Sequence, residues 1–244
     1  MVDTAGVKFR KNPGSAVALV LCSHPNFAVL VGAGVAGAAA LSGRPLREVG
    51  LVFATVVVGR LTAGWLNDVA DRERDIAVDR QDKPLARDWI HPSTVTFTVA
   101  CATLLLIPLS VSNGTQAGVA HLVSVLAAWL YNTRIKLGLM SWFPWAISFG
   151  MFPAFLSYGG WGGGVHGGPP TPALVLLAAL LGIGLHVALA LSDLVMDNRN
   201  GVRSLPVVIA LKIGAAKLLY ATAAYLLLVG GGIVWVGLTV GLHA

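Results

Sequence analysis

The chain has 244 residues, of which 56% are hydrophobic and only 11% are charged, and its formal net charge at pH 7 is +6. Soluble domains carry about 25% charged residues, so this composition excludes a soluble enzyme, a disordered chain and a nucleic-acid-binding domain. The basic charge balance is therefore interpreted first by the charge rule of membrane proteins.

Seven stretches are apolar and long enough to cross a bilayer, which takes about 20 helical residues. In chain order they cover residues 18–42, 48–67, 93–112, 116–134, 140–160, 173–193 and 213–241. The last stretch is long for one span, and we expect it to tilt or to break at Gly230-Gly231-Gly232. The predicted fold class is all-α: a polytopic helical membrane bundle with about seven transmembrane helices.

Lysine and arginine predict the orientation of these spans. With the N-terminus inside, fourteen of the 17 basic residues lie on the inner side, Arg44 and Arg47 lie outside, and Arg60 lies within a span. Cytoplasmic loops carry such an excess of basic residues. We therefore expect an integral protein of a bacterial plasma membrane, in contact with the lipid bilayer and with a cytoplasmic N-terminus.

The acidic residues are the most informative group. Nine of the 11 fall in two clusters on the predicted inner side, and each cluster begins where an apolar stretch ends. The first cluster follows stretch 48–67 and the second ends stretch 173–193; their members are Asp68, Asp71, Glu73, Asp75, Asp79, Asp82 and Asp88, and then Asp193 and Asp197. We interpret Glu73, Asp79, Asp82 and Asp88 as a solvated charged loop.

The spacing of the other acids indicates a metal site. If the second helix continues past the membrane edge, Arg60, Gly64, Asn67 or Asp68, Asp71 and Asp75 share one of its faces. Carboxylates so close together repel one another unless cations lie among them, and Mg²⁺ is held by carboxylates together with substrate phosphates. Asp193 and Asp197 repeat the four-residue spacing. The predicted metal ligands are Asn67, Asp68, Asp71, Asp75, Asp193 and Asp197.

Basic residues near both clusters are candidate phosphate ligands, because Arg and Lys bind phosphate oxygens through charge-assisted hydrogen bonds. The predicted diphosphate-binding residues are Asn67, Arg80, Lys83, Tyr131, Lys136 and Arg203. The alternative for each basic residue is a topological anchor on the inner side. Arg60 differs because it lies about two turns inside a span, where a charge is costly and usually functional. It is expected to pair with an acid or to donate to the diphosphate.

These motifs resemble the UbiA family of intramembrane prenyltransferases. Residues 67–75 match its NDxxDxxxD motif, and Arg60 and Gly64 precede it as in the family. Arg80 and Lys83-Pro84-Leu85 resemble its Arg-x-x-Arg-Pro-Leu/Ile continuation, with Lys83 in place of the second Arg. The run from Asp193 to Ser204 resembles its second aspartate motif, and Tyr131 and Lys136 resemble its Tyr…Lys pair. Ser23-His24-Pro25 and Trp142-Phe143-Pro144 are similar to actinobacterial branches.

The resemblance implies Mg²⁺-dependent transfer of an isoprenyl group from an isoprenyl diphosphate to a lipophilic or aromatic acceptor, in a cavity that opens to the cytoplasm. Asp71, Asp193 and Arg60 are then the expected catalytic residues. Family members generally have nine spans, so the chain is expected to be one integral-membrane domain, residues 1–244, lacking the last two helices. The alternatives are a membrane terpene cyclase with the same chemistry, an inactive or truncated relative, and a transporter.

Overall fold

The computed structural model describes residues 12–160 and 168–242, and every element of regular secondary structure in these residues is a helix. The basic N-terminal segment, residues 1–11, for which a cytoplasmic location is predicted, lies outside the described residues. The elements are α1 (Ser15–Cys22), α2 (Pro25–Leu41), α3 (Leu46–Ala77), α4 (Pro92–Val111), α5 (Thr115–Tyr131), η1 (Arg134–Leu137), η2 (Leu139–Trp142), α6 (Phe143–Ser157), α7 (Pro172–Ala190), α8 (Leu194–Arg199), α9 (Leu205–Ile213) and α10 (Ala215–Thr239).

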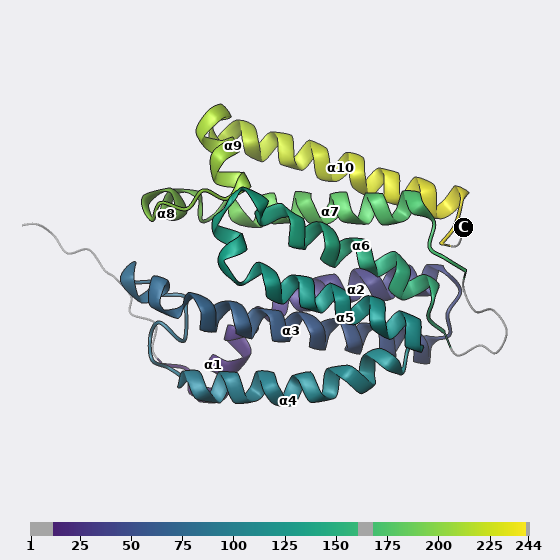
Figure 1. Cartoon of the computed structure of the whole chain (residues 1–244), viewed down its shortest axis with the longest axis horizontal. Helices are drawn as coiled ribbons and strands as arrows, with labels where there is room; N and C mark the ends of the chain where they lie inside the picture. The colour runs from purple at the N-terminus through teal and green to yellow at the C-terminus, as the bar shows by residue number, and fades with distance from the viewer. Residues whose placement is uncertain (1–11, 161–167, 243–244) are drawn as a thin grey trace, which may run out of the picture.

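The helices form the predicted membrane bundle. Within the described residues, five segments are long and apolar enough to cross a membrane, and the α1–α2 pair, bent by 50°, raises the number to six. These five are α3, α4, residues 139–157, α7 and α10, and the shorter apolar α5, with 17 residues, occupies the remaining predicted stretch. Consecutive helices pack against each other along a common long axis (Figure 1). The all-α prediction is confirmed.

Two predicted stretches show where the helices break. The first stretch is divided into α1 and α2, because His24 has a left-handed backbone (φ 52°) just before Pro25, the first residue of α2. A residue before proline is disfavoured in the α-helical region, so the helix breaks there. Of the two alternatives for the last stretch, the break at Gly230–Gly232 is excluded, because α10 continues through these glycines, and the tilt stays a prediction. In lipid an interrupted helix leaves backbone groups without partners, which favours an unbroken helix.

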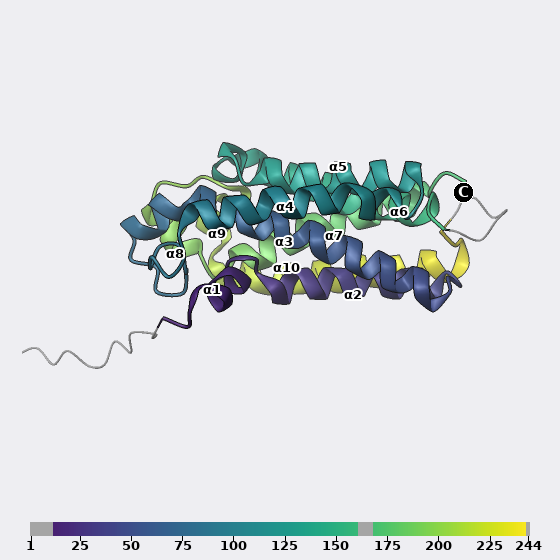
Figure 2. The same cartoon turned by 90° about the horizontal axis from the view of Figure 1, so that it is seen from below.

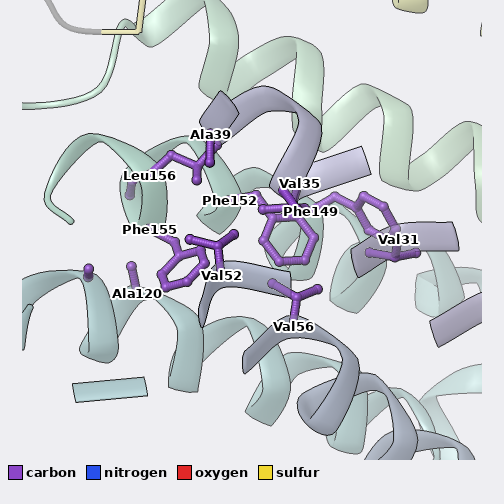
Figure 3. Packing of buried hydrophobic residues seen from close by; sticks show 13 residues of the cluster. Val31, Val35, Ala39, Val52, Val56, Ala120, Phe149, Phe152, Phe155 and Leu156 are labelled. Atoms are coloured by element: carbon purple, nitrogen blue, oxygen red, sulfur yellow. The ribbon is translucent and has the colours of Figure 1, made fainter. Parts of the chain in front are cut away.

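One cluster of buried side chains fixes the helices around which the bundle is built. Val31 and Val35 of α2 and Val52 and Val56 of α3 pack against phenylalanines of α6 (Figure 3). Ala120 of α5 closes the cluster from another side. Because interiors are densely packed, this contact sets the relative positions of α2, α3, α5 and α6. Each of these four helices contributes residues to the lining of the cavity described below.

Close backbone contacts bring the bend between α1 and α2 against α3. A Cβ atom at Gly64 of α3 would lie 2.2 Å from the backbone oxygen of Ser23. The indole N–H of Trp65 donates to the Leu19 oxygen at 2.8 Å and ties α1 to the same turn of α3. Gly64 is therefore required by packing, because any other residue forces the bend away from the helix. Figure 2 shows α1 and α2 along α3, seen from below.

The Gly64 contact leads to a stability prediction. We expect Gly64→Ala to lower the thermal unfolding temperature of the purified protein in detergent, because inserting a methyl group into a closed contact costs about 1–3 kcal/mol. Gly37→Ala is the matched control, since Gly37 is also helical and a Cβ there meets nothing within 4 Å. Equal unfolding temperatures for the two variants would contradict this account of Gly64.

Candidate functional site

The first acidic motif lies on the part of α3 that extends toward the polar end of the bundle. Asn67, Asp71 and Asp75 are four residues apart and line a cavity of about 470 Å³, together with Arg60 and Gly64 on the same face. Acidic residues near a helix C-terminus oppose the helix dipole, so the helix itself gains no stability from Asp75 in its last turn. The stability of the helix therefore does not account for the placement of these acids.

The second acidic motif reaches the same cavity from α7. This helix ends at Ala190, Asp193 precedes the short helix α8, and Asp197 lies in its first turn. Both carboxylates line the cavity. The guanidinium of Arg80 joins the second motif to the loop after α3, because it lies 3.2 Å from Asp193 and donates two hydrogen bonds to Asp82, at 2.8 and 2.9 Å.

Asp82 lines the cavity although it is exposed. Its side chain is 57% exposed, as the interpretation of a solvated acid expects, and it pairs with Arg80. The hydrogen bonds from Arg80 lower the pKa of the Asp82 carboxyl to about 2. The same pairing raises the pKa of Arg80. The sequence spacing does not show that Arg80 turns toward Asp82.

Lys136 balances the charge of the first motif. Its ammonium lies 2.5 Å from Asp71 and 3.4 Å from the amide oxygen of Asn67, and Arg74 lies 3.5 Å from the same Asp71 carboxylate. Burial lowers the pKa of Lys136, although the negative charge of Asp71 opposes this shift. Lys136 therefore places its own ammonium group at the cavity wall, where it would attract an anionic ligand.

Two carboxylates in the cavity remain without a basic partner. Within residues 12–160 and 168–242, no Lys, Arg or His nitrogen lies within 4.0 Å of Asp75 or Asp197. Burial, followed by repulsion from Asp193, raises the pKa of Asp197. Burial and like charge both disfavour the ionised form of such carboxylates, so a bound cation would stabilise them.

Arg60 lies deeper in the bundle and is almost fully buried. Its guanidinium donates to the hydroxyls of Ser148 (2.8 Å) and Ser124 (3.3 Å) and lies 5.0 Å and 5.2 Å from the rings of Phe149 and Phe152. Among the described residues no carboxylate pairs with it, so the acid partner expected from the sequence is replaced by hydroxyls and aromatic rings. The remaining N–H donors are available at the cavity wall.

Aromatic side chains form the apolar part of the cavity. Tyr131 meets Trp145 edge to face at 5.5 Å, and Phe27 lies 5.8 Å from Trp145 on the other side. All three line the cavity. The site therefore combines a charged mouth at the end of the bundle with an aromatic wall between the helices, which suits a ligand with an anionic head and an apolar tail.

The structure brings together ten of the twelve sequence-predicted residues. Those that line the cavity are Arg60, Asn67, Asp71, Asp75, Arg80, Lys83, Tyr131, Lys136, Asp193 and Asp197. Asp68 and Arg203 do not line it. Asp68 points to Lys83 and His24, and the Arg203 guanidinium donates to the Asn198 side chain at 3.3 Å and to the Val202 carbonyl at 3.1 Å.

Sequence reasoning missed several polar or aromatic groups of the cavity. They are His24, Asn132, Trp145, Ser148 and Asn200. Ser148 carries one usable signal, a hydroxyl within an apolar stretch, whereas His24 reaches the cavity only because α2 begins with a bend.

Comparison with known proteins identifies the family. The UbiA prenyltransferase family matches residues 27–244, which is most of the chain. The chain belongs to the UbiA prenyltransferase family. The 33 kDa chain of bacteriochlorophyll synthase from Cereibacter sphaeroides is 30% identical over 184 residues, 71% of this chain. The chain spans 58% of the length of that relative.

Solved structures show the same fold. A UbiA homologue from Archaeoglobus fulgidus superimposes with a TM-score of 0.70 at 16% identity, over 92% of this chain and 80% of the homologue. The structure of that homologue bound to GPP and Mg²⁺ gives a TM-score of 0.68 at 17% identity, over 88% of this chain and 77% of the other. The helical arrangement of the UbiA fold is therefore shared, although few residues are identical.

The shared cavity leads to a topological prediction for this UbiA protein. We expect cysteines introduced at Asp82 and Asn200 to react with a membrane-impermeant maleimide from the same side of the membrane, because both residues line one cavity. A cysteine at the exposed Gln116, in the first turn of α5, is expected to react from the other side. The background carries Cys101→Ala, since Cys101 is exposed. Labelling of positions 82 and 200 from opposite sides would contradict the shared site.

Proposed function

We propose that this chain is a Mg²⁺-dependent intramembrane prenyltransferase, which moves an isoprenyl group from an isoprenyl diphosphate to a lipophilic or aromatic acceptor. The observation that carries the proposal is the meeting of the two acidic motifs in one cavity, with an aromatic wall beside them. Membership of the UbiA family supports the reaction class. The homologue from Archaeoglobus fulgidus, which has been solved with DMAPP and Mg²⁺, supports the donor and the metal.

The residues of the cavity fit Mg²⁺. Asp75 and Asp197 supply carboxylate oxygens without basic partners, and Asn67, Asp71 and Asp193 supply further oxygens beside them. Among the described residues, no group of three or more His, Cys, Asp or Glu side chains is arranged to hold a metal alone. This agrees with the coordination habit of Mg²⁺, which is bound by one or two carboxylates, water and substrate phosphates.

The chain's own residues divide the chemistry between the two parts of the cavity. Bound Mg²⁺ supplies a Lewis acid that neutralises the charge of the diphosphate leaving group. Arg80, Lys83 and Lys136 bind phosphate oxygens and stabilise the charge that develops as the allylic C–O bond breaks. Tyr131 and Trp145 cover the reacting carbon and limit the access of water, so that the acceptor rather than water captures the prenyl group.

We also propose that the acidic end of the bundle faces the cytoplasm. Arg80, Lys83 and Lys136 lie at the cavity, and Arg134, Arg199, Arg203 and Lys212 belong to segments at the same end. Basic residues of short loops concentrate on the cytoplasmic side. Maleimide added to intact cells should therefore fail to reach cysteines at positions 82 and 200, and should reach them in inverted vesicles.

The first functional prediction concerns two carboxylates of the cavity: Asp71, which pairs with Lys136, and Asp197, which has no basic partner among the described residues. We expect Asp71→Asn and Asp197→Asn each to lower Mg²⁺-dependent diphosphate release at least 100-fold, about 2.7 kcal/mol of transition-state stabilisation. The measurement is diphosphate release and product formation from C10 to C50 prenyl diphosphates in membranes, with and without a cell extract that supplies acceptors.

The matched control for this test is Asp88→Asn. Asp88 is exposed, pairs with Arg72 and lies outside the cavity lining, and asparagine tolerates its left-handed backbone. We expect its turnover to equal that of the parent. Near-parental turnover in both cavity variants would refute the diphosphate site. A prenyl product formed without an acceptor would show that the protein is a cyclase and not a transferase.

The second functional prediction concerns Arg60. We expect Arg60→Lys to insert normally and to lose at least tenfold in rate, about 1.4 kcal/mol, because an ammonium cannot copy the guanidinium fork that meets two serines and still faces the cavity. Arg60→Ala should lose more. Unfolding temperatures of the purified variants control for folding. Parental turnover by Arg60→Lys would show that Arg60 acts only as a buried structural cation.

A further inference from the structure

Asp68 stands apart from the other acids of its motif. It follows Asn67 directly, and consecutive helical residues point about 100° apart, so its side chain leaves the face that lines the cavity. The residue is 1% exposed, whereas Asp71 and Asp75 reach the cavity. The structure therefore separates Asp68 from the residues that can hold Mg²⁺.

The Asp68 carboxylate has two close partners from other segments. Its Oδ1 atom accepts a hydrogen bond from the Lys83 ammonium at 2.7 Å and lies 2.9 Å from Nε2 of His24. A carboxylate and an imidazole nitrogen without hydrogen repel each other, which favours the tautomer in which Nε2 donates to Asp68. The Lys83 ammonium lies 3.1 Å from the same nitrogen, so Asp68, Lys83 and His24 form one polar cluster.

The two partners lie at the cavity although Asp68 does not. His24 comes from the bend between α1 and α2, with its side chain 43% exposed, and Lys83 comes from the loop between α3 and α4. The neighbouring Leu85 is buried against Cys22 and Ala18 of α1, which anchors that loop beside the bend. One buried carboxylate on α3 therefore joins two segments that each contribute a basic residue to the cavity lining.

We propose that Asp68 is a positioning residue and not a metal ligand: it holds the Lys83 ammonium and the His24 imidazole at the cavity wall, where both side chains contact the diphosphate of the substrate. This inference rests on the proposed function for the identity of the ligand. A cation held by a buried carboxylate keeps its direction, and a positioned donor loses less entropy on binding phosphate than a free lysine. His24 thereby becomes a diphosphate-contacting residue.

The test separates metal binding from diphosphate binding in the purified full-length protein in nanodiscs. Mn²⁺ replaces Mg²⁺ and is titrated by electron paramagnetic resonance, and inorganic pyrophosphate is titrated by calorimetry at saturating Mn²⁺. The variants are Asp68→Asn, Asp71→Asn, Lys83→Met, His24→Gln and the double variant Asp68→Asn/Lys83→Met. Thermal unfolding of each variant reports on folding.

A positioning role predicts a distinct pattern. Asp68→Asn should bind Mn²⁺ within twofold of the parent, while Asp71→Asn should bind it at least tenfold more weakly. Asp68→Asn, Lys83→Met and His24→Gln should each weaken pyrophosphate binding at least fivefold. The double variant should lose less affinity than the product of the two single effects, because Asp68 acts in part through Lys83.

Three results would overturn the inference. Loss of Mn²⁺ binding in Asp68→Asn equal to that in Asp71→Asn would make Asp68 a metal ligand. Parental pyrophosphate binding by both Lys83→Met and His24→Gln would remove their contact with the ligand, and these variants give an answer even if Asp68→Asn does not fold. Multiplying effects in the double variant would show that Asp68 does not act through Lys83.

The same experiment distinguishes this inference from the proposed function. A parent that binds Mn²⁺ and pyrophosphate but transfers no prenyl group would refute the transferase, while the pattern of binding among the variants still decides the role of Asp68.

Discussion

The balance of charge at one end of an apolar bundle is the constraint on which the site depends. A helical bundle in lipid gains nothing from carboxylates at the end of α3, and the helix dipole there opposes them. The chain nevertheless places acids from α3 and α8 in one cavity and compensates them unequally: Lys136 and Arg74 balance Asp71, and Arg80 balances Asp193. Asp75 and Asp197 retain the uncompensated charge that a divalent cation would neutralise.

The unequal compensation divides the cavity into two parts. Toward its charged end, acids pair with basic side chains, as Asp68 does with Lys83 and Asp82 with Arg80. These pairs restrict the directions in which the basic groups point. Farther into the bundle the polar groups give way to Arg60 on its two serines and to the aromatic wall, so polarity decreases along the path that a prenyl diphosphate would occupy.

Much of this arrangement could be predicted from the sequence. The four-residue spacing of Asn67, Asp71 and Asp75 needs only helical periodicity, and the apolar stretches indicate the bundle. The sequence left open whether Asn67 or Asp68 shares the cavity face, because both fit a face of that width. In the structure Asn67 lines the cavity and Asp68 does not.

Contacts that form only in the folded chain set the features that sequence could not give. The approach of Ser23 to Gly64 brings His24 to the cavity from 40 residues away in the sequence. Arg203 was predicted to bind phosphate from its place after the second motif, whereas its side chain makes local hydrogen bonds to Asn198 and Val202. The pairing of Arg80 with Asp82 is also local and depends on the fold of the loop. No periodic pattern in the sequence indicates these contacts.

The most direct test of the shared site is to locate the metal. Crystals of the full-length protein grown with Mn²⁺ and an unreactive prenyl thiolodiphosphate would show the metal by anomalous scattering. The account predicts Mn²⁺ between α3 and α8, coordinated by carboxylates of both motifs and by the diphosphate, with Asp68 outside the coordination sphere. Mn²⁺ bound by one motif alone, or outside the cavity, would contradict it.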